Sequence, residues 1–239
     1  MKNNNEHFLK LIFDKIALKY DVTNDFLSFG LINYFRKLAI KKFVSYLPDY
    51  GKILDVGVGS GKMLLLTYKY SLKFNKNLYL YGLDFSEKML DLAEKNFKKK
   101  QIKNYFFRCC DASALNKLNE YYDGIILSFF LRNFFYVENF VKILENVIND
   151  KSFLLLLELV RPKKNILLEK WMKYVITNIG GLINGNKLAY EYLVDSIYSF
   201  YNYKQTIDFF EKKNWKILYC KTFIYDLLLI AIFQKKSQL

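Results

Sequence analysis

A glycine-rich loop beside a carboxylate is the first feature of this sequence with the chemistry of a binding site. Residues 55–61 are Asp-Val-Gly-Val-Gly-Ser-Gly and follow a short apolar run. Glycines there let the backbone turn sharply and approach a ligand closely. Asp84 ends the next apolar run, about 20 residues beyond the loop, where a carboxylate can accept both ribose hydroxyls of an adenosine-containing cofactor. Asp111-Ala112 follows the third run and is placed to reach an adenine edge.

NAD and S-adenosylmethionine both suit a glycine loop followed by an acidic residue, and the details of the loop favour the second. Its spacing is Gly-x-Gly-x-Gly rather than Gly-x-Gly-x-x-Gly. The Asp55 carboxylate would repel a pyrophosphate, whereas it can face a sulfonium or an ammonium group. The alternative is a purely structural turn. Three carboxylates, each at the end of a predicted strand, argue against that alternative.

Residue counts exclude several other kinds of chemistry. The chain has one histidine, His7, and three cysteines, of which Cys109 and Cys110 are adjacent. Zinc sites that need several histidines, and Ser-His-Asp or Cys-His catalysis, are therefore not expected. We expect no metal site, no disulfide framework and a reduced cytosolic setting.

The formal net charge of +14 has two interpretations. Only four of the 37 basic residues are arginines, while Lys, Asn, Ile, Tyr and Phe abound and Gly (10) and Pro (2) are scarce. All five abundant types have A/T-rich codons, so a nucleotide bias of the genome accounts for the excess of lysine. The alternative is an anionic partner, either a membrane or RNA.

Alternating strand and helix patterns position these residues. Helical spacing of apolar residues alternates with short buried-strand runs through the first two thirds of the chain, which predicts a doubly wound, parallel α/β sheet with helices on both faces. The predicted strands are 52–56, 78–83, 105–109, 122–128, 153–159, 216–219 and 227–233.

We expect a single domain of residues 1–239, since its length suits one α/β unit with additions. The alternation stops after residue 162, where an apolar helix, a glycine-containing loop at 180–186 and a Tyr-rich helix are predicted. No run approaches the ~20 apolar residues of a membrane span, and no signal peptide is visible. The predicted parts are an N-terminal helical segment (1–47), a cofactor-binding half (48–162), a helical cap (163–203) and a final helix and strand pair (204–239).

The sequence resembles a known family. The nucleotide-binding motifs of class I methyltransferases are matched by Ile53–Gly61, Gly82–Leu90 and Asp111-Ala112. Four further stretches narrow the resemblance to the ubiquinone/menaquinone biosynthesis C-methyltransferases and cover nearly the whole chain in order. They are Phe13–Asp21 with Asn24 and Leu27–Leu31, Leu131-Arg132-Asn133, Glu158–Pro162, and Tyr192–Phe200.

This resemblance implies a Rossmann-like class I methyltransferase fold. Its sheet has seven strands and is mostly parallel with an antiparallel last strand, and N-terminal helices and an inserted helical cap complete it. The implied cofactor is S-adenosyl-L-methionine. The residues implied to bind it are Asp55, Gly57, Gly59, Ser60, Gly61, Asp84, Phe85, Asp111, Ala112 and Ser128.

The implied reaction is C-methylation of a prenylated hydroquinol, demethylmenaquinol and/or a 2-polyprenyl-6-methoxy-benzoquinol, in quinone biosynthesis. Such a ring becomes a competent carbon nucleophile when a hydroxyl proton is lost, and no histidine base is required. Arg132 is expected to stabilise the phenolate, Asn133 to hold a quinol oxygen, and Tyr20 to close the other side. The structural alternatives are an ion pair for Arg132, a helix cap for Asn133 and packing for Tyr20.

Two departures from the family pattern keep other functions open. Lys62 stands where the family has an acidic residue, and Phe130 stands where it has glycine. The alternatives are another small-molecule methyltransferase, an RNA methyltransferase, and a scaffold with a decayed cofactor loop.

The expected partner is the quinol, with no nucleic acid, and a homo-oligomer or a quinone-biosynthesis complex is left open. Lys170, Lys173 and Lys187 beside apolar residues resemble a surface amphipathic helix, or alternatively a lid packed on the core. We therefore expect a cytoplasmic protein with peripheral contact at the inner face of the membrane.

Overall fold

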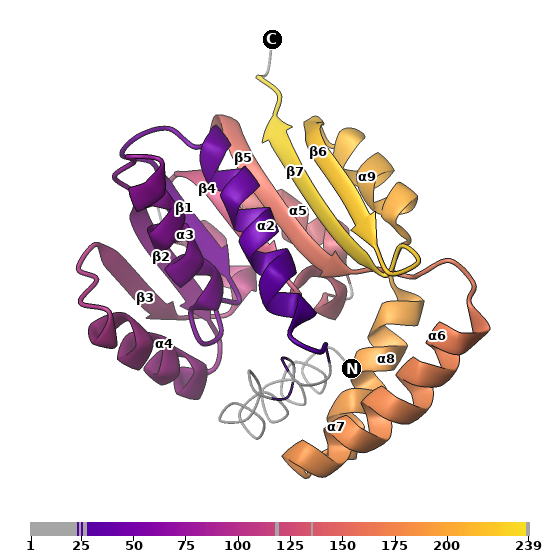
Figure 1. Ribbon diagram of the computed structural model, residues 1–239. Coiled ribbons are helices and arrows are strands. Elements are labelled where there is room, and N and C mark those ends of the chain that lie inside the picture. Colours follow the sequence, from indigo (N-terminus) through magenta and orange to yellow (C-terminus); the bar gives the residue numbers. More distant parts are fainter. Residues whose placement is uncertain (1–22, 24, 26–27, 118–119, 135, 238–239) are drawn as a thin grey trace.

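The computed structural model describes residues 23, 25, 28–117, 120–134 and 136–237, which form a sheet with helices on both faces and a group of helices at one end (Figure 1). The strands are β1 (Lys52–Val56), β2 (Tyr79–Asp84), β3 (Tyr105–Cys109), β4 (Tyr122–Ser128), β5 (Ile148–Leu159), β6 (Trp215–Phe223) and β7 (Leu228–Lys235). The α-helices are α2 (Leu31–Tyr46), α3 (Lys62–Lys73), α4 (Glu87–Lys99), α5 (Val137–Glu145), α6 (Ile166–Lys170), α7 (Thr177–Asn184), α8 (Lys187–Ser199) and α9 (Tyr203–Glu211). Short turns η1 (Ala112–Lys117) and η2 (Leu131–Asn133) follow β3 and β4, and a π-helical segment η3 (Trp171–Ile176) joins α6 to α7.

The described strands form one sheet in the order β3-β2-β1-β4-β5-β7-β6. β1 pairs in parallel with β2 and β4, whereas β7 pairs antiparallel with both β5 and β6. The predicted doubly wound sheet with an antiparallel last strand is confirmed. From β1, the strands β2 and β3 are added on one side of the sheet, and the later strands are added on the other side, beginning with β4. The carboxyl ends of β1 and β4 are neighbours at this switch point, which is where α/β sheets bind ligands.

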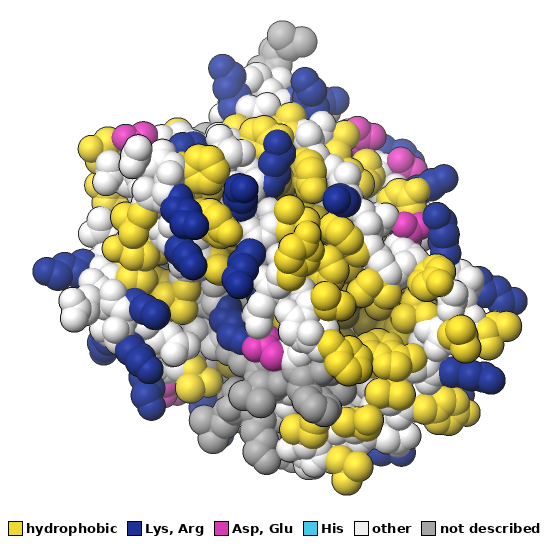
Figure 2. Space-filling model, in the orientation of Figure 1, with side chains coloured by type: hydrophobic (Ala, Val, Ile, Leu, Met, Phe, Trp, Pro, Cys, Tyr) yellow, Lys and Arg dark blue, Asp and Glu magenta, His cyan; other side chains and the backbone are white. Residues whose placement is uncertain are grey.

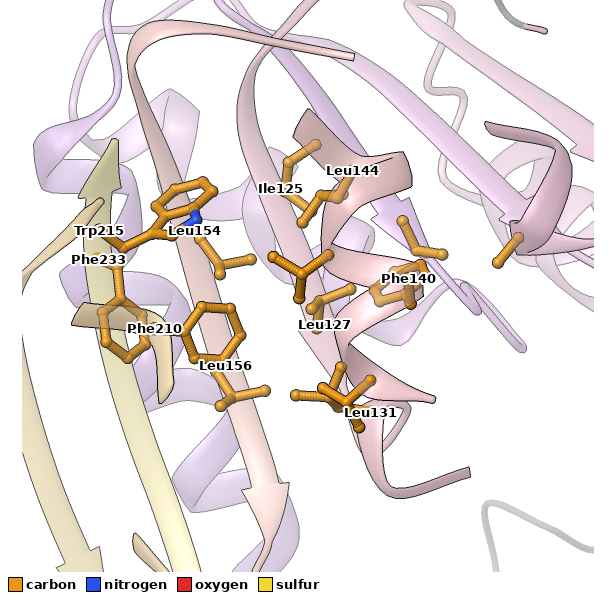
Figure 3. Close-up of a cluster of buried hydrophobic side chains, with 14 of the residues drawn as sticks. Ile125, Leu127, Leu131, Phe140, Leu144, Leu154, Leu156, Phe210, Trp215 and Phe233 are labelled. Atoms are coloured by element: carbon orange, nitrogen blue, oxygen red, sulfur yellow. The ribbon is translucent and has the colours of Figure 1, made fainter. Parts of the chain in front are cut away.

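Alternate residues of the central strands supply two separate cores. On β5, Leu154 and Leu156 face α5 and α9, while Leu155 and Leu157 face α2 and α3. Figure 3 shows the first core, in which Phe210 and Trp215 pack against Phe233 beside these leucines. Both faces of the central strands are therefore buried, which explains their nearly continuous apolar sequence.

The helices α6, η3, α7 and α8 form a third, smaller cluster that we call the lid. Its buried residues pack mainly on one another and on Leu227, directly before β7. The predicted loop at 180–186 is wrong, because α7 continues through both glycines to Asn184. A Cβ on Gly180 would lie 2.5 Å from the Tyr190 ring, so these glycines allow α7 and α8 to pack closely rather than ending the helix. No helix in the described ranges is both long and apolar enough to cross a membrane.

Candidate functional site

The glycine loop lies between β1 and α3 and is fastened to the end of β2. The amides of Gly57 and Val58 both donate to the Leu83 carbonyl, at 2.8 and 2.9 Å. Gly57, Gly59 and Gly61 have φ of 74°, 53° and 81°, in the left-handed region that side chains disfavour. The loop therefore needs glycine at each of these positions to take this path.

Phe130 fits against the loop because residue 57 is glycine. A Cβ at Gly57 would lie 2.4 Å from the Phe130 ring, which also packs against Phe134 and Phe140. The departure from the family pattern at Phe130 is thus accommodated by close packing, and the loop keeps its form. Lys62, the other departure, lies 3.4 Å from the Asp25 carboxylate, so an acidic neighbour balances its charge.

Asp84 is buried at the end of β2 and holds the loop by hydrogen bonds. One carboxylate oxygen accepts the Gly59 amide at 2.8 Å, and the other accepts the Ser86 amide at 2.9 Å. Asp84 therefore has a role that the sequence did not indicate, which is to fix the glycine loop. Its predicted contact with ribose hydroxyls stays a prediction.

The remaining predicted cofactor residues lie at neighbouring strand ends. Asp111 is exposed after β3 and accepts the Ser113 amide at 2.6 Å, and Ala112 is buried at the start of η1. Phe85 follows Asp84 directly, and Ser128 is the last residue of β4. Ser60 is buried in the loop, where its carbonyl accepts the Asn96 side chain. The predicted set thus extends along the carboxyl-terminal end of the sheet, from β3 to β4.

Asp55 is the unusual member of this set. Its carboxylate is buried, and neither oxygen has a hydrogen-bond partner among the residues that the structure describes. Burial, and secondarily the negative charge of Asp84, raise the pKa of Asp55 well above its usual range, against an opposing effect of Arg36. A buried carboxylate without a partner is costly, and a cationic ligand would relieve that cost. S-adenosylmethionine carries an ammonium and a sulfonium, so the site fits it.

A cavity of about 420 Å³ lies beside the carboxyl-terminal end of the sheet, between the start of α2, the end of β4 and the lid. Its walls are mostly apolar, and Arg132, Asn133 and Tyr192 are among the few polar side chains that reach it. Phe129 also lines it and has φ of 55°, which is rare for an aromatic residue and turns the chain sharply after β4. The size and lining suit a small apolar ligand with one polar end.

Arg132 lies in a buried ion pair with Glu158. Its Nη1 is 2.5 Å from one Glu158 oxygen, and side-chain exposures are 6% and 0%. Glu158 also accepts the amides of Arg132 and Leu159, whereas Nε of Arg132 has no partner among the described residues. The ion-pair alternative for Arg132 is therefore present in the structure, and Arg132 also lines the cavity.

Asn133 is not a helix cap, since α5 begins after Tyr136. Its Oδ1 accepts the Tyr192 hydroxyl at 3.4 Å, which connects η2 to the lid. Burial raises the pKa of Tyr192, opposed by Arg132. Tyr20 lies outside the described residues, so its role stays a prediction.

Three residues of the site were given no catalytic or binding role by the sequence. Glu158 is the one acidic residue in the apolar run Phe153–Leu159 of β5, and Arg36 is the one basic residue on the buried face of α2; both placements are visible signals. Tyr192 begins one of the family-matching stretches, but nothing distinguished it among 20 tyrosines.

The sheet order and the glycine-loop site define a class I S-adenosylmethionine-dependent methyltransferase fold. The solved structure of the plantazolicin methyltransferase BamL, in complex with a triazolic desmethylPZN analog and SAH, matches 98% of both chains with a TM-score of 0.62 at 16% identity. That likeness concerns the fold.

The chain belongs to the ubiE/COQ5 methyltransferase family, whose sequence profile matches residues 1–226. A demethylmenaquinone methyltransferase of Thermotoga maritima is 30% identical over 216 residues, which are 89% of each chain. A ubiquinone/menaquinone biosynthesis C-methyltransferase UbiE of Campylobacter jejuni is 30% identical over 230 residues, 94% of this chain and 96% of the relative. The family resemblance and the methyltransferase class expected from the sequence are confirmed.

Proposed function

We propose that this protein transfers a methyl group from S-adenosylmethionine to a ring carbon of a prenylated hydroquinol, demethylmenaquinol or a 2-polyprenyl-6-methoxy-benzoquinol. The observation that carries the proposal is the apolar cavity, whose few polar lining residues include Arg132 and Asn133, shortly after the carboxyl end of β4. An RNA substrate is disfavoured, because a flipped base needs several polar partners and this lining is mostly apolar.

The cofactor would supply an electrophilic methyl group, held by the loop and by Asp55, Asp84 and Asp111. The chain's own residues would make the ring nucleophilic. Arg132 stabilises the negative charge of the quinol oxygen when its proton passes to water, and Asn133 orients that oxygen. After the ring carbon has taken the methyl group and S-adenosylhomocysteine has been released, the hydrogen on that carbon leaves as a proton, the oxygen is protonated again and the hydroquinol ring is restored. The lid and Phe129 exclude water from the reacting carbon. Glu158 keeps the Arg132 guanidinium at the cavity wall.

The test is a reaction of the purified protein with S-adenosylmethionine and a reduced short-chain demethylquinone. We expect a product carrying one additional methyl group on ring carbon, identified by mass spectrometry and NMR. Absence of product, while calorimetry shows that S-adenosylhomocysteine binds, would contradict the quinol substrate but not the methyltransferase fold.

We further propose that the lid and the cavity mouth form a membrane-docking face. The exposed apolar side chains there include Leu167 (79% exposed), Leu182 (82%) and Phe29 (82%), and Figure 2 shows yellow side chains gathered over the part of the molecule that Figure 1 assigns to α6, α7 and α8. Residues 161–199 contain six basic and three acidic side chains, so this face is net positive. An apolar face with surrounding lysines fits an anionic bilayer, from which a prenyl tail would reach the cavity.

A Leu167→Ser/Leu182→Ser variant is expected to bind vesicles of phosphatidylglycerol and phosphatidylcholine at least about tenfold more weakly, since each leucine contributes roughly 1.5 kcal/mol or more on burial. Vesicle cosedimentation measures the change. Leu72→Ser on α3, an exposed leucine (58%) away from the lid, is the control and should not alter binding. Equal losses from both variants, or unchanged binding of the lid variant, would contradict a docking face on the lid.

A further inference from the structure

Arg36 is a buried cation that the structure leaves short of partners. Helix α2 places it on the same face as Phe35, Ala39, Ile40 and Phe43, and only 5% of its surface is exposed. Arginine is almost never buried to this degree unless it is paired, because an ionised guanidinium loses its hydration there. A reason for its position is therefore needed.

The contacts of Arg36 within the protein are few. Its Nη1 donates to Oδ1 of Asn33, one turn earlier in α2, at 3.3 Å. The guanidinium carbon lies 6.0 Å from the centre of the Phe129 ring, and Nε has no hydrogen-bond partner in the described part of the chain. Among the described residues, no carboxylate lies within 4.0 Å of the guanidinium. These residues therefore give the buried cation one neutral hydrogen bond and one ring face, and no opposite charge.

The location of Arg36 shows what these donors face. Phe129 directly follows β4, and the positive charge of Arg36 partly offsets the rise that burial and Asp84 cause in the pKa of Asp55 near the end of β1. The guanidinium therefore lies near the meeting point of the carboxyl ends of β1 and β4, close to the glycine loop. The buried Asp55 carboxylate and the buried Arg36 guanidinium thus lie near the same end of the sheet, and each lacks a partner of opposite charge at hydrogen-bond distance among the described residues.

We infer that Arg36 binds the α-carboxylate of the cofactor's amino-acid arm, while Asp55 faces its α-ammonium. This rests on the cofactor of the proposed function. The arm is a zwitterion. Its carboxylate therefore balances the charge of Arg36, and its ammonium balances the charge of Asp55. The planar fork of donors on a guanidinium suits a carboxylate, and lysine would not reproduce it. Arg36 is then a cofactor-binding residue on the N-terminal helix rather than on the sheet.

The test compares two ligands that differ in this arm. S-adenosylhomocysteine has the amino-acid arm, and 5′-methylthioadenosine keeps the adenosine and the sulfur without it. For Arg36→Gln, calorimetry should show about 10- to 100-fold weaker binding of S-adenosylhomocysteine and binding of 5′-methylthioadenosine within twofold of the native chain. Arg36→Lys should lie between. Arg161→Gln, a surface arginine paired with Gln205, is the control and should change neither.

A second measurement uses the native chain and therefore does not depend on whether the variant folds. The native chain should bind decarboxylated S-adenosylmethionine at least about tenfold more weakly than S-adenosylmethionine. Equal affinity for these two ligands, or an equal loss of both nucleosides in Arg36→Gln, would overturn the assignment. If the native chain bound none of the ligands, the proposed function would fail instead, so the two failures are distinguishable.

Discussion

An Asp55→Asn variant should melt at a higher temperature than the native chain without cofactor, and should bind S-adenosylhomocysteine at least about tenfold more weakly. Within the described part of the chain, the Asp55 carboxylate is buried without a hydrogen-bond partner, beside the negative charge of Asp84. An amide of the same shape does not carry this penalty, because it bears no charge. Each kcal/mol gained raises the melting temperature by about 2–4 °C for a chain of this length. The affinity falls because the amide cannot neutralise the ligand's cation.

The raised pKa of Asp55 also predicts how the difference in stability between the variant and the native chain changes with pH. Folding raises the pKa of Asp55, so between its unfolded and folded values the native state holds a proton that the unfolded state has released. Stability therefore falls as pH rises through that interval, and the penalty is complete above the folded pKa. The Asn variant lacks this term. Its advantage over the native chain, measured by calorimetric melting, should grow from low to neutral pH.

Asp84→Asn is the matched control. The Asp84 carboxylate accepts two backbone amides, from Gly59 and Ser86, so its loss should lower the melting temperature. Both variants remove one negative charge from the same edge of the sheet. If both shifted the melting temperature in the same direction, the absence of partners around Asp55 would not explain its effect.

The sequence predicted those parts of the fold and site whose signals are local. The strands β1 and β2 are short apolar runs; β1 is followed by a glycine and β2 ends at a carboxylate. The loop at 57–61 is defined by glycines that its φ angles require. Asp84 was correctly placed at the end of a strand. Its hydrogen bonds to the loop were not predicted, because they join residues 25 apart in sequence.

Signals that depend on tertiary contacts were missed or misinterpreted. Gly180 and Gly181 indicated a loop, whereas their small size serves the packing of α7 against α8. Arg36 counted as one more basic residue until α2 placed it between the core and the end of β4. The Arg132–Glu158 pair joins η2 to β5, and only the parallel pairing of β4 with β5 brings the two residues together.

This pair carries the prediction with the largest effect on turnover. Replacing Arg132 alone would leave the Glu158 carboxylate buried and unpaired, at a cost of about 3–5 kcal/mol of stability, so a loss of activity would be ambiguous. Arg132→Gln/Glu158→Gln removes both charges and keeps two groups that can hydrogen bond. Turnover should fall about 10²- to 10³-fold, as expected for loss of one group that stabilises an oxyanion. The affinity for S-adenosylhomocysteine should stay within twofold.

The control is the Lys235–Glu145 pair, whose charged atoms are 2.6 Å apart at a distance from the cavity. Lys235→Gln/Glu145→Gln should leave turnover unchanged although it removes a comparable ion pair. If the Arg132 double variant lost cofactor affinity as strongly as turnover, Arg132 would belong to the cofactor site and its assignment to the quinol would be wrong.

The pH profile then separates charge stabilisation from positioning. A guanidinium beside the quinol hydroxyl lowers the pKa of that hydroxyl, so the native enzyme should reach its plateau of turnover at a lower pH than the neutral double variant. In the variant, turnover should keep rising with pH toward the ordinary range of a phenol, near 10. A profile that falls in parallel at every pH would show instead that Arg132 only shapes the cavity, because a lost positioning contact reduces turnover without moving the titration of the substrate.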